Sequence, residues 1–302
     1  MQSGGGGAVS GLTVAIDVGG TKLVGALLDD DGVRHRVERP TPGPPGAADP
    51  GSQALRELAA ELAAVAGQER ADREGVGVTA VGVGCCEYVD GGRLTSTEVL
   101  AWTEQPGDWL PTLFPGATVV VESDVRCGLM AERRLGAARE VDSAVFVSWG
   151  TGLSSAVLLD GRIWSGTRGR AIALGELPGP LGLNLEGFVS GAGMAARWGS
   201  ATGHAGRDAR ALLAAAESGE PTAQAIAATA GQALAEALSG VAHLLDPARI
   251  VLGGGLGCAD TVARRALTRR WSRSGSTAVL VIAEVGPDGP LLGAGLAAGW
   301  HG

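Results

Sequence analysis

The sequence repeats one strand–turn–strand pattern at two remote places. The first copy, VAIDVGGTKLVGALLD, spans residues 14–29, and the second copy, AVFVSWGTGLSSAVLLDGRIW, spans residues 144–164. In each copy an apolar strand leads through a Gly/Thr turn into a second apolar strand, which ends at an acidic turn. A strand pair repeated in this way predicts a β-meander in each half of the chain.

Asp17 is the residue that a simple hairpin does not explain, and two interpretations of the first turn stay open. In one, Gly19 and Gly20 supply the positive backbone torsions of a tight hairpin, and the carboxylate at the end of the strand has no purpose. In the other, this carboxylate meets a cation, and the glycines let backbone N–H groups approach a phosphate closely.

A third apolar strand runs into a glycine turn in RIVLGGGLG, residues 249–257. Each strand–glycine turn presents unpaired N–H groups to an anion, so three of them predict that several parts of one nucleotide are bound at one cleft. The sequence G-x-x-x-x-G-K-[ST] is absent, and GVGCCE, residues 82–87, lacks the last glycine of G-x-G-x-x-G. The pattern therefore indicates neither a P-loop enzyme nor a dinucleotide-binding βαβ unit.

The rest of the chain alternates predicted strands and helices, which indicates the α/β class. Apolar residues at helical spacing predict a helix over residues 52–66, with Ser52 as its N-cap. The Ala-rich stretch 208–245 predicts two helices that break near Ser218 and Gly219. Further elements are expected as helices over residues 125–135 and 289–300, strands over residues 76–84 and 119–122, and a Pro/Gly-rich loop over residues 41–51.

Composition narrows the functional classes. The chain has 302 residues and a formal net charge of -8, without blocks of consecutive Lys or Arg, which argues against binding to nucleic acid. It shows neither a secretory signal pattern nor an apolar run long enough to span a membrane, so we expect no membrane partner and a cytoplasmic protein. The four cysteines lack C-x-x-C spacing and are expected as core thiols in a reducing compartment. Residues 1–11 are expected to form a disordered leader.

The order of these motifs resembles the actin-like sugar kinase superfamily and, within it, the ROK family. AIDVGGTKL resembles the first phosphate motif of the family, VSWGTGLSSAVLLDGRIWSG its second, LLDPARIVLGGGLG its adenosine segment, and GPLLGAGLAA its C-terminal stretch. The resemblance implies an α/β, two-domain actin-like (ribonuclease H-like) fold with an interdomain cleft. It divides the chain into a small domain, residues 12–124 and 288–302, and a large domain, residues 125–287. We also expect a homodimer.

The resemblance assigns Asp124 as the catalytic base, in the position of the Asp of an Asn-Asp pair, with Ser123 in place of the Asn. The alternative, that Asp124 only caps the following helix, stays open. Asp17 is expected to bind Mg²⁺, through water. Lys22, the only lysine of the chain, either contacts phosphate or points beside the cleft. The full set of residues expected to bind ATP is Asp17, Gly19, Gly20, Thr21, Lys22, Gly150, Thr151, Gly152, Gly253, Gly254 and Gly255.

The chain departs from the family at its zinc motif. The family carries an E-x-G-H sequence followed by a cysteine-rich loop that binds structural zinc. Here Glu176 matches the Glu, Gly179 stands in place of the His, and no Cys or His lies between Leu177 and Gly191. Since zinc needs three or four such ligands, we predict that this protein binds no zinc.

The expected acceptor site also departs from the family. Glu186 matches a sugar-contacting Glu, Glu176 is a second expected contact, and Val99 and Ser123 replace amides that would bond to ring hydroxyls. Each lost hydrogen bond costs about 1 kcal/mol or more, so glucose is expected to bind poorly.

These features predict an ATP- and Mg²⁺-dependent kinase of a sugar-like polyol. The departures resemble those of C7-cyclitol kinases of secondary metabolism, which act on valiolone-type compounds. A hexose or amino-sugar kinase is the alternative. A non-catalytic sugar-sensing regulator is the second alternative. It is disfavoured because the regulators of the family carry an N-terminal helix-turn-helix domain, for which the residues before the first motif leave no room, and because Asp124 speaks for catalysis.

Overall fold

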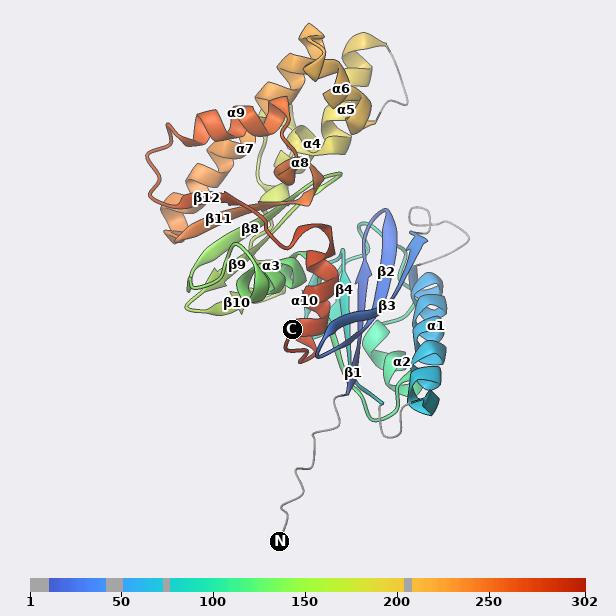
Figure 1. The fold of residues 1–302 in the computed structure, drawn as a ribbon. Coiled ribbons are helices and arrows are strands. Elements are labelled where there is room, and N and C mark those ends of the chain that lie inside the picture. Colours follow the sequence, from blue (N-terminus) through green and yellow to red (C-terminus); the bar gives the residue numbers. More distant parts are fainter. Residues whose placement is uncertain (1–10, 42–50, 73–76, 204–207) are drawn as a thin grey trace. The chain divides into compact units, whose positions relative to one another are not determined.

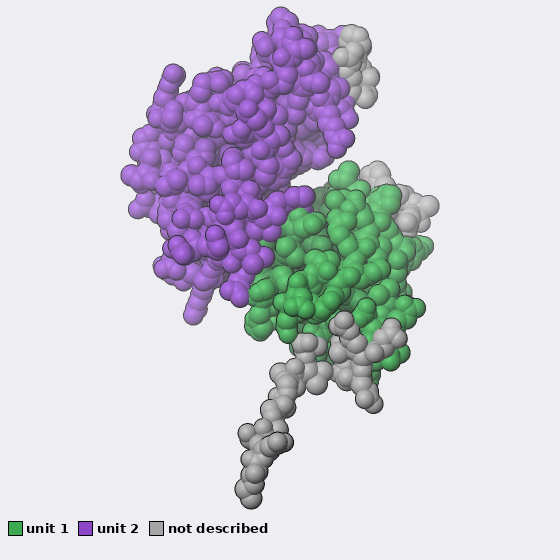
Figure 2. Space-filling view, in the orientation of Figure 1, with its two compact units in different colours: residues 1–131, 288–302 green, residues 132–287 purple. Residues whose placement is uncertain are grey.

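The computed structural model describes residues 11–41, 51–72, 77–203 and 208–302 (Figure 1). The expected leader over residues 1–11, apart from Gly11, and most of the expected loop over residues 41–51 lie outside these ranges. No described helix combines the length and the apolar character that crossing a membrane requires. The chain forms two compact units, residues 1–131 with 288–302 and residues 132–287 (Figure 2).

The first unit is built on a five-stranded mixed sheet. Strands β1, β2 and β3 form an antiparallel meander, and β4 and β7 continue the sheet parallel to β1. The order across the sheet is β3 (Gly32–Pro40), β2 (Lys22–Asp29), β1 (Leu12–Val18), β4 (Val78–Cys85) and β7 (Thr118–Ser123). The strands β5 (Val89–Asp90) and β6 (Arg93–Leu94) form a separate small hairpin.

Helices cover both faces of this sheet (Figure 1). Leu12, Val14, Ile16 and Val18 of β1 share a core cluster with α1 (Gly51–Asp72) and α2 (Pro106–Leu113). On the other face, β1 contributes the small Ala15, against which α10 (Gly289–Ala297) packs. Small residues are needed here, because a Cβ on Gly82 would lie 1.8 Å from the carbonyl oxygen of Ala294.

The second unit repeats this sheet topology. β8 (Ala144–Trp149), β9 (Leu153–Leu159) and β10 (Arg162–Trp164) form an antiparallel meander, and β11 (Arg249–Gly253) and β12 (Val279–Ile282) extend the sheet in parallel. The order β10-β9-β8-β11-β12 corresponds to β3-β2-β1-β4-β7 of the first unit. The meander predicted in each half of the sequence is therefore confirmed, as is the α/β class.

Helices and 3-10 turns complete the chain. The helix α3 (Asp124–Leu135) follows β7 directly. The helical elements after β10 are the 3-10 turns Leu174–Glu176 and Pro180–Gly182, α4 (Leu185–Val189), α5 (Gly191–Thr202), α6 (Ala209–Glu217), α7 (Pro221–Leu245), α8 (Gly254–Cys258), α9 (Val262–Trp271) and the 3-10 turn Gly286–Asp288. The break predicted near Ser218 and Gly219 is confirmed, since it separates α6 from α7.

Two local predictions are wrong. Because α1 begins at Gly51, Ser52 lies inside the first turn and is not the N-cap; its hydroxyl accepts the N–H groups of Thr103 and Glu104 instead. Among the cysteines, Cys258 is exposed and is therefore not a core thiol.

Candidate active site

The turn between β1 and β2 presents free backbone N–H groups. Its base is closed by the N–H of Gly19, which donates to the carbonyl of Lys22 at 3.0 Å, and by the hydroxyl of Thr41, which donates to the carbonyl of Gly19 at 2.6 Å. Gly20 and Thr21 at the tip are exposed. Within the described residues their N–H groups have no hydrogen-bond partner. Such a turn can accept an anion.

The glycines of this turn are not required by backbone torsion. β1 and β2 form the expected hairpin, but neither Gly19 nor Gly20 has a positive φ, so the torsional reason for these two glycines is wrong. A Cβ would have tight contacts at both positions. A Cβ on Gly20 would lie 3.2 Å from Cγ1 of Val99, and a Cβ on Gly19 would lie 3.1 Å from the carbonyl oxygen of Lys22.

Asp17 ends β1 beside this turn and carries an unpartnered oxygen. Its Oδ1 is shielded from solvent and has no hydrogen-bond partner among the described residues. The pKa of Asp17 is raised to about 8, mainly by burial and also by the charges of Asp124 and Asp288, while the charge of Lys22 opposes the rise. A carboxylate held in this way lacks a cation, so the donor fits Mg²⁺, which prefers oxygen ligands and keeps several waters.

Asp124 is the first residue of α3 and lies in the same unit as Asp17. Its Oδ1 accepts the N–H of Val125 at 2.6 Å. The pKa of Asp124 is raised to about 7: burial is the main cause and the charge of Glu87 contributes, while the hydrogen bonds from Val125 and the Ser123 hydroxyl limit the rise. A carboxylate whose pKa lies near neutrality suits proton transfer.

The remaining candidates of this unit take different positions. Ser123 is buried and its hydroxyl bonds to Asp124. Val99 is 38% exposed, and its Cγ1 lies 3.2 Å from the position that a Cβ on Gly20 of the β1–β2 turn would take. Lys22 Nζ lies 3.2 Å from Glu38 Oε2 at the exposed end of β2, so its ammonium group has a carboxylate partner. A phosphate contact by Lys22 stays a prediction.

The second unit has an equivalent turn between β8 and β9. The N–H of Gly150 donates to the carbonyl of Gly152 at 3.0 Å. Thr151 and Gly152 are exposed, and their N–H groups are unpartnered in the part of the chain that the structure describes. The carbonyls of Gly150 and Thr151 accept the N–H groups of Gly191 and Ala192 at 2.8 and 3.1 Å, which fastens the turn to α5.

Glu186 is fixed beside this second turn. Its Oε2 accepts the N–H of Leu153 at 2.7 Å and lies 3.0 Å from the position of a Cβ on Gly152. Glu176 is exposed at the end of a 3-10 turn, and a Cβ on the preceding Gly175 would lie 3.2 Å from Cβ of Glu186. The structure thus places the segment that carries Glu176 against Glu186.

The third glycine segment is a strand-to-helix junction, where the sequence predicted a loop. β11 ends at Gly253 and α8 begins at Gly254. Gly254 must be glycine, because its φ is +74° and a Cβ would lie 2.5 Å from the carbonyl oxygen of Trp149. Gly255 is exposed, and its nitrogen lies 3.6 Å from the position of a Cβ on Gly150. Two of the glycine segments therefore meet within this unit.

The loop that replaces the zinc motif is held by backbone hydrogen bonds. Pro178 pairs with Asn184 in an isolated β-bridge, Gly179 N–H donates to the carbonyl of Leu183 at 2.8 Å, and Leu185 N–H donates to that of Leu177 at 2.7 Å. The described residues contain no group of three or more His, Cys, Asp or Glu side chains placed to hold a metal. The donor set of this loop does not fit zinc.

Two acidic residues of the first unit were not among the expected site residues. Glu87 is 4% exposed, follows β4 and raises the pKa of Asp124; Asp288, just before α10, raises that of Asp17. GVGCCE was interpreted only as an incomplete dinucleotide motif. A glutamate so close to the end of a buried strand is the same signal that singled out Asp17.

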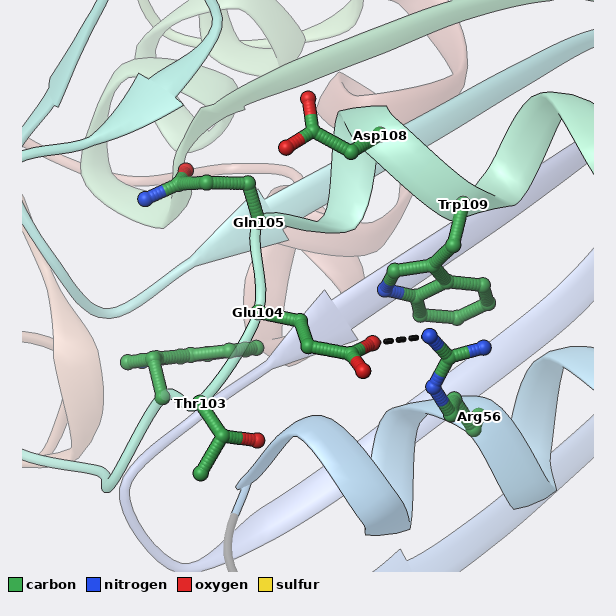
Figure 3. Close-up of a pocket in the computed structure, with 7 residues that line it drawn as sticks. Arg56, Thr103, Glu104, Gln105, Asp108 and Trp109 are labelled. Carbon is green, nitrogen blue, oxygen red and sulfur yellow. Dashed lines mark hydrogen bonds and ion pairs between the residues drawn. The ribbon is translucent and has the colours of Figure 1, made fainter.

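A separate cavity of about 500 Å³ lies between α1, α2 and residues 102–105 (Figure 3). The guanidinium of Arg56 lies 4.3 Å above the ring of Trp109 and pairs with Glu104. Asp108 pairs with Arg93 at 2.9 Å. Arg56 of the lining is therefore paired with a carboxylate of the same cavity.

Comparison with known proteins agrees with this geometry. A model of the ROK family matches residues 13–299. The bifunctional enzyme NanE/NanK of Brucella suis biovar 1 is 35% identical over 301 residues, covering 93% of this chain and 52% of that protein. The N-acetylmannosamine kinase of Citrobacter koseri is 32% identical over 259 residues, covering 82% of this chain and 84% of that protein. The chain is also similar to the ROK hexokinase from Thermus thermophilus, whose crystal structure aligns with a TM-score of 0.77 and a sequence identity of 28%. The alignment covers 95% of this chain and 97% of that chain.

The two equivalent sheets and their glycine turns define the two-domain, actin-like α/β fold of the ROK sugar kinases. This chain belongs to the ROK family. It spans about half the length of the bifunctional Brucella relatives.

Proposed function

We propose that this protein is an ATP-dependent kinase that transfers the γ-phosphate to a hydroxyl of a sugar-like polyol. The observation that carries the proposal is the pair Asp17 and Asp124. Both carboxylates belong to one unit, both have a pKa raised toward neutrality, and Asp17 adjoins a turn with two free N–H groups. A general base and a metal-binding carboxylate beside a phosphate turn are the parts that phosphoryl transfer needs.

Each carboxylate has its own task in this proposal. Asp124 accepts the proton of the acceptor hydroxyl as its oxygen attacks phosphorus, and Ser123 orients this carboxylate through its hydroxyl. The unpartnered oxygen of Asp17 is the group that would hold Mg²⁺ through its water ligands. Mg²⁺, when bound, neutralises charge on the transferring phosphate. The N–H groups of Gly20 and Thr21 bind terminal phosphate oxygens.

In the same proposal the second unit binds the remainder of the nucleotide. Its turn at Thr151 and Gly152 also offers two free N–H groups, and Gly255 lies close to Gly150. Glu186 is fixed by Leu153 at the edge of this turn, where it would contact the acceptor.

The identity of the acceptor divides the proposal into two forms. The names of the relatives, an N-acetylmannosamine kinase and a hexokinase, support an amino sugar or a hexose. Val99 has no side-chain hydrogen-bonding group, and the hydroxyl of Ser123 is bonded to Asp124; these two residues support a polyol with another hydroxyl arrangement, such as a valiolone-type C7-cyclitol. The loop around Gly179, held by backbone hydrogen bonds, supports a protein that needs no zinc. A homodimer and a cytoplasmic location, where ATP is available, complete the proposal.

An acceptor panel tests this function. The purified protein is incubated with Mg·ATP and either N-acetylmannosamine, glucose or a valiolone-type cyclitol, and ADP release is followed by a coupled assay. We expect one acceptor class to stimulate ADP release well above the acceptor-free rate. Sugar binding without turnover of any acceptor would contradict the kinase and support the sugar-sensing alternative.

A further inference from the structure

Glu87 is a buried carboxylate that accepts four hydrogen bonds from one short segment, residues 96–100. Its Oε1 accepts the N–H groups of Val99 and Leu100, each at 2.9 Å. Its Oε2 accepts the N–H of Glu98 at 2.9 Å and the hydroxyl of Ser96. Buried carboxylates are costly unless they are satisfied in this way.

The segment that Glu87 holds, residues 96–100, has no helix or strand of its own. One hydrogen bond holds the chain at each end of this segment. The N–H of Tyr88 donates to Ser96 Oγ at 2.9 Å, and the N–H of Gly51 donates to the carbonyl of Ala101 at 2.8 Å. Between them, Glu87 supplies the acceptors for three successive backbone N–H groups. The conformation of the segment therefore depends on this one side chain.

The same segment touches the candidate active site. Cγ1 of Val99 lies 3.2 Å from the position that a Cβ on Gly20 would take, so Val99 rests against the tip of the phosphate turn. Glu87, which holds this segment, is also close enough to Asp124 for its charge to raise the pKa of the Asp124 carboxyl. Glu87 thus links the surface beside the phosphate turn with the candidate base.

We propose that Glu87 is a positioning residue for the acceptor: it fixes residues 96–100 so that Val99 forms one wall of the acceptor site beside the phosphate turn. This inference rests on the proposed kinase function. Glu87 acts through the segment and does not itself touch the reacting atoms.

Glu87→Gln is the informative change, because it keeps the shape of the side chain. In glutamine an NH₂ group, which is a donor, replaces one of the two carboxylate oxygens. If it replaces Oε1, the N–H groups of Val99 and Leu100 lose their acceptor; if it replaces Oε2, the N–H of Glu98 and the hydroxyl of Ser96 lose theirs. An unsatisfied buried donor costs about 1–3 kcal/mol, which corresponds to about a 5- to 150-fold change in an equilibrium. Glu104→Gln, the same substitution at an exposed residue, is the matched control.

The experiment combines hydrogen–deuterium exchange with kinetics. We expect Glu87→Gln to accelerate amide exchange in residues 98–100 about tenfold or more, and to raise the KM of the acceptor turned over by wild type about 10- to 100-fold. The Kd for Mg·ADP should stay within about threefold of wild type, and Glu104→Gln should change none of these quantities. Glu87→Asp keeps the charge and should give a KM between those of wild type and Glu87→Gln.

The outcomes separate this inference from the function on which it rests. Wild-type protein that turns over no acceptor would contradict the kinase. Active wild-type protein with unchanged exchange or unchanged acceptor KM in Glu87→Gln would overturn the positioning role. If Glu87→Gln does not fold, Glu87→Asp decides: a raised acceptor KM supports the role, and a wild-type KM overturns it.

Discussion

Replacing Asp17 by Asn should make the unliganded protein more stable while it impairs nucleotide binding. Burial raises the pKa of this carboxyl from its ordinary value of 3.8 to about 8. Between these values the folded protein holds a proton that the unfolded chain releases. Stability from this group is therefore fully present below pH 3.8 and is lost as the pH rises toward 8.

The size of the effect follows from the pKa. At pH 7 the ordinary value lies about three units below the pH, and one unit corresponds to about 1.36 kcal/mol, which gives an upper limit of about 4 kcal/mol. Because Asp17 is partly exposed, solvent screens its charge, and we expect a gain in the free energy of unfolding of about half this limit, about 2 kcal/mol. For a protein of this size, a difference of about 2 kcal/mol raises the melting temperature by about 4–8 °C.

Thermal denaturation between pH 4 and pH 8 measures this prediction. We expect the advantage of Asp17→Asn over wild type to grow as the pH rises, and calorimetry should show Mg·ADP binding weakened about tenfold or more. Asp90→Asn is the control, because it removes an exposed carboxylate from the same unit. The burial argument would be refuted if Asp17→Asn were less stable than wild type at pH 7 and if the melting temperatures of the two proteins changed with pH in the same way.

Three further predictions concern local structure and metal content. Glu132, 2% exposed, accepts the N–H groups of Ala137, Glu284 and Val285, so Glu132→Gln should lower the free energy of unfolding by about 2–4 kcal/mol; an unchanged urea midpoint would contradict this. Gly254→Ala should lower the melting temperature, since Gly254 has a φ of +74° beside the Trp149 backbone; a wild-type melting curve would show that the turn can adapt. Elemental analysis should find far less than one zinc per chain, whereas stoichiometric zinc would disprove the argument from the missing ligands.

The sequence predicted the sheets because their signal is local. The strand–turn–strand pattern around Gly19 and its copy around Gly150 specify hairpins by period and turn residues, and the structure contains both. The helix after Ser123 was equally visible from its apolar spacing. Asp17 stood out because a carboxylate at the end of an apolar strand is costly without a partner.

The parts that the sequence could not predict depend on contacts between remote residues. Ser52 has the side chain of an N-cap, but its hydroxyl bonds to the chain 51 and 52 residues further on. Gly20 is explained by Val99 across the site and not by its own torsion. Glu87 binds a segment whose path is irregular. No periodicity reports such contacts, because each depends on how the tertiary fold brings the chain together.

The most direct test of the central claim is the phosphoryl-transfer rate of Asp124→Asn with the acceptor that wild type uses. Asn keeps the size of the side chain and an oxygen for the N–H of Val125, so the fold should survive. General-base assistance is worth about 10²- to 10⁴-fold in rate. We expect kcat to fall by about this factor while the Kd for Mg·ADP stays within about threefold of wild type. Near-normal kcat would show that Asp124 has only a structural role at the start of α3 and would contradict the proposed catalytic centre.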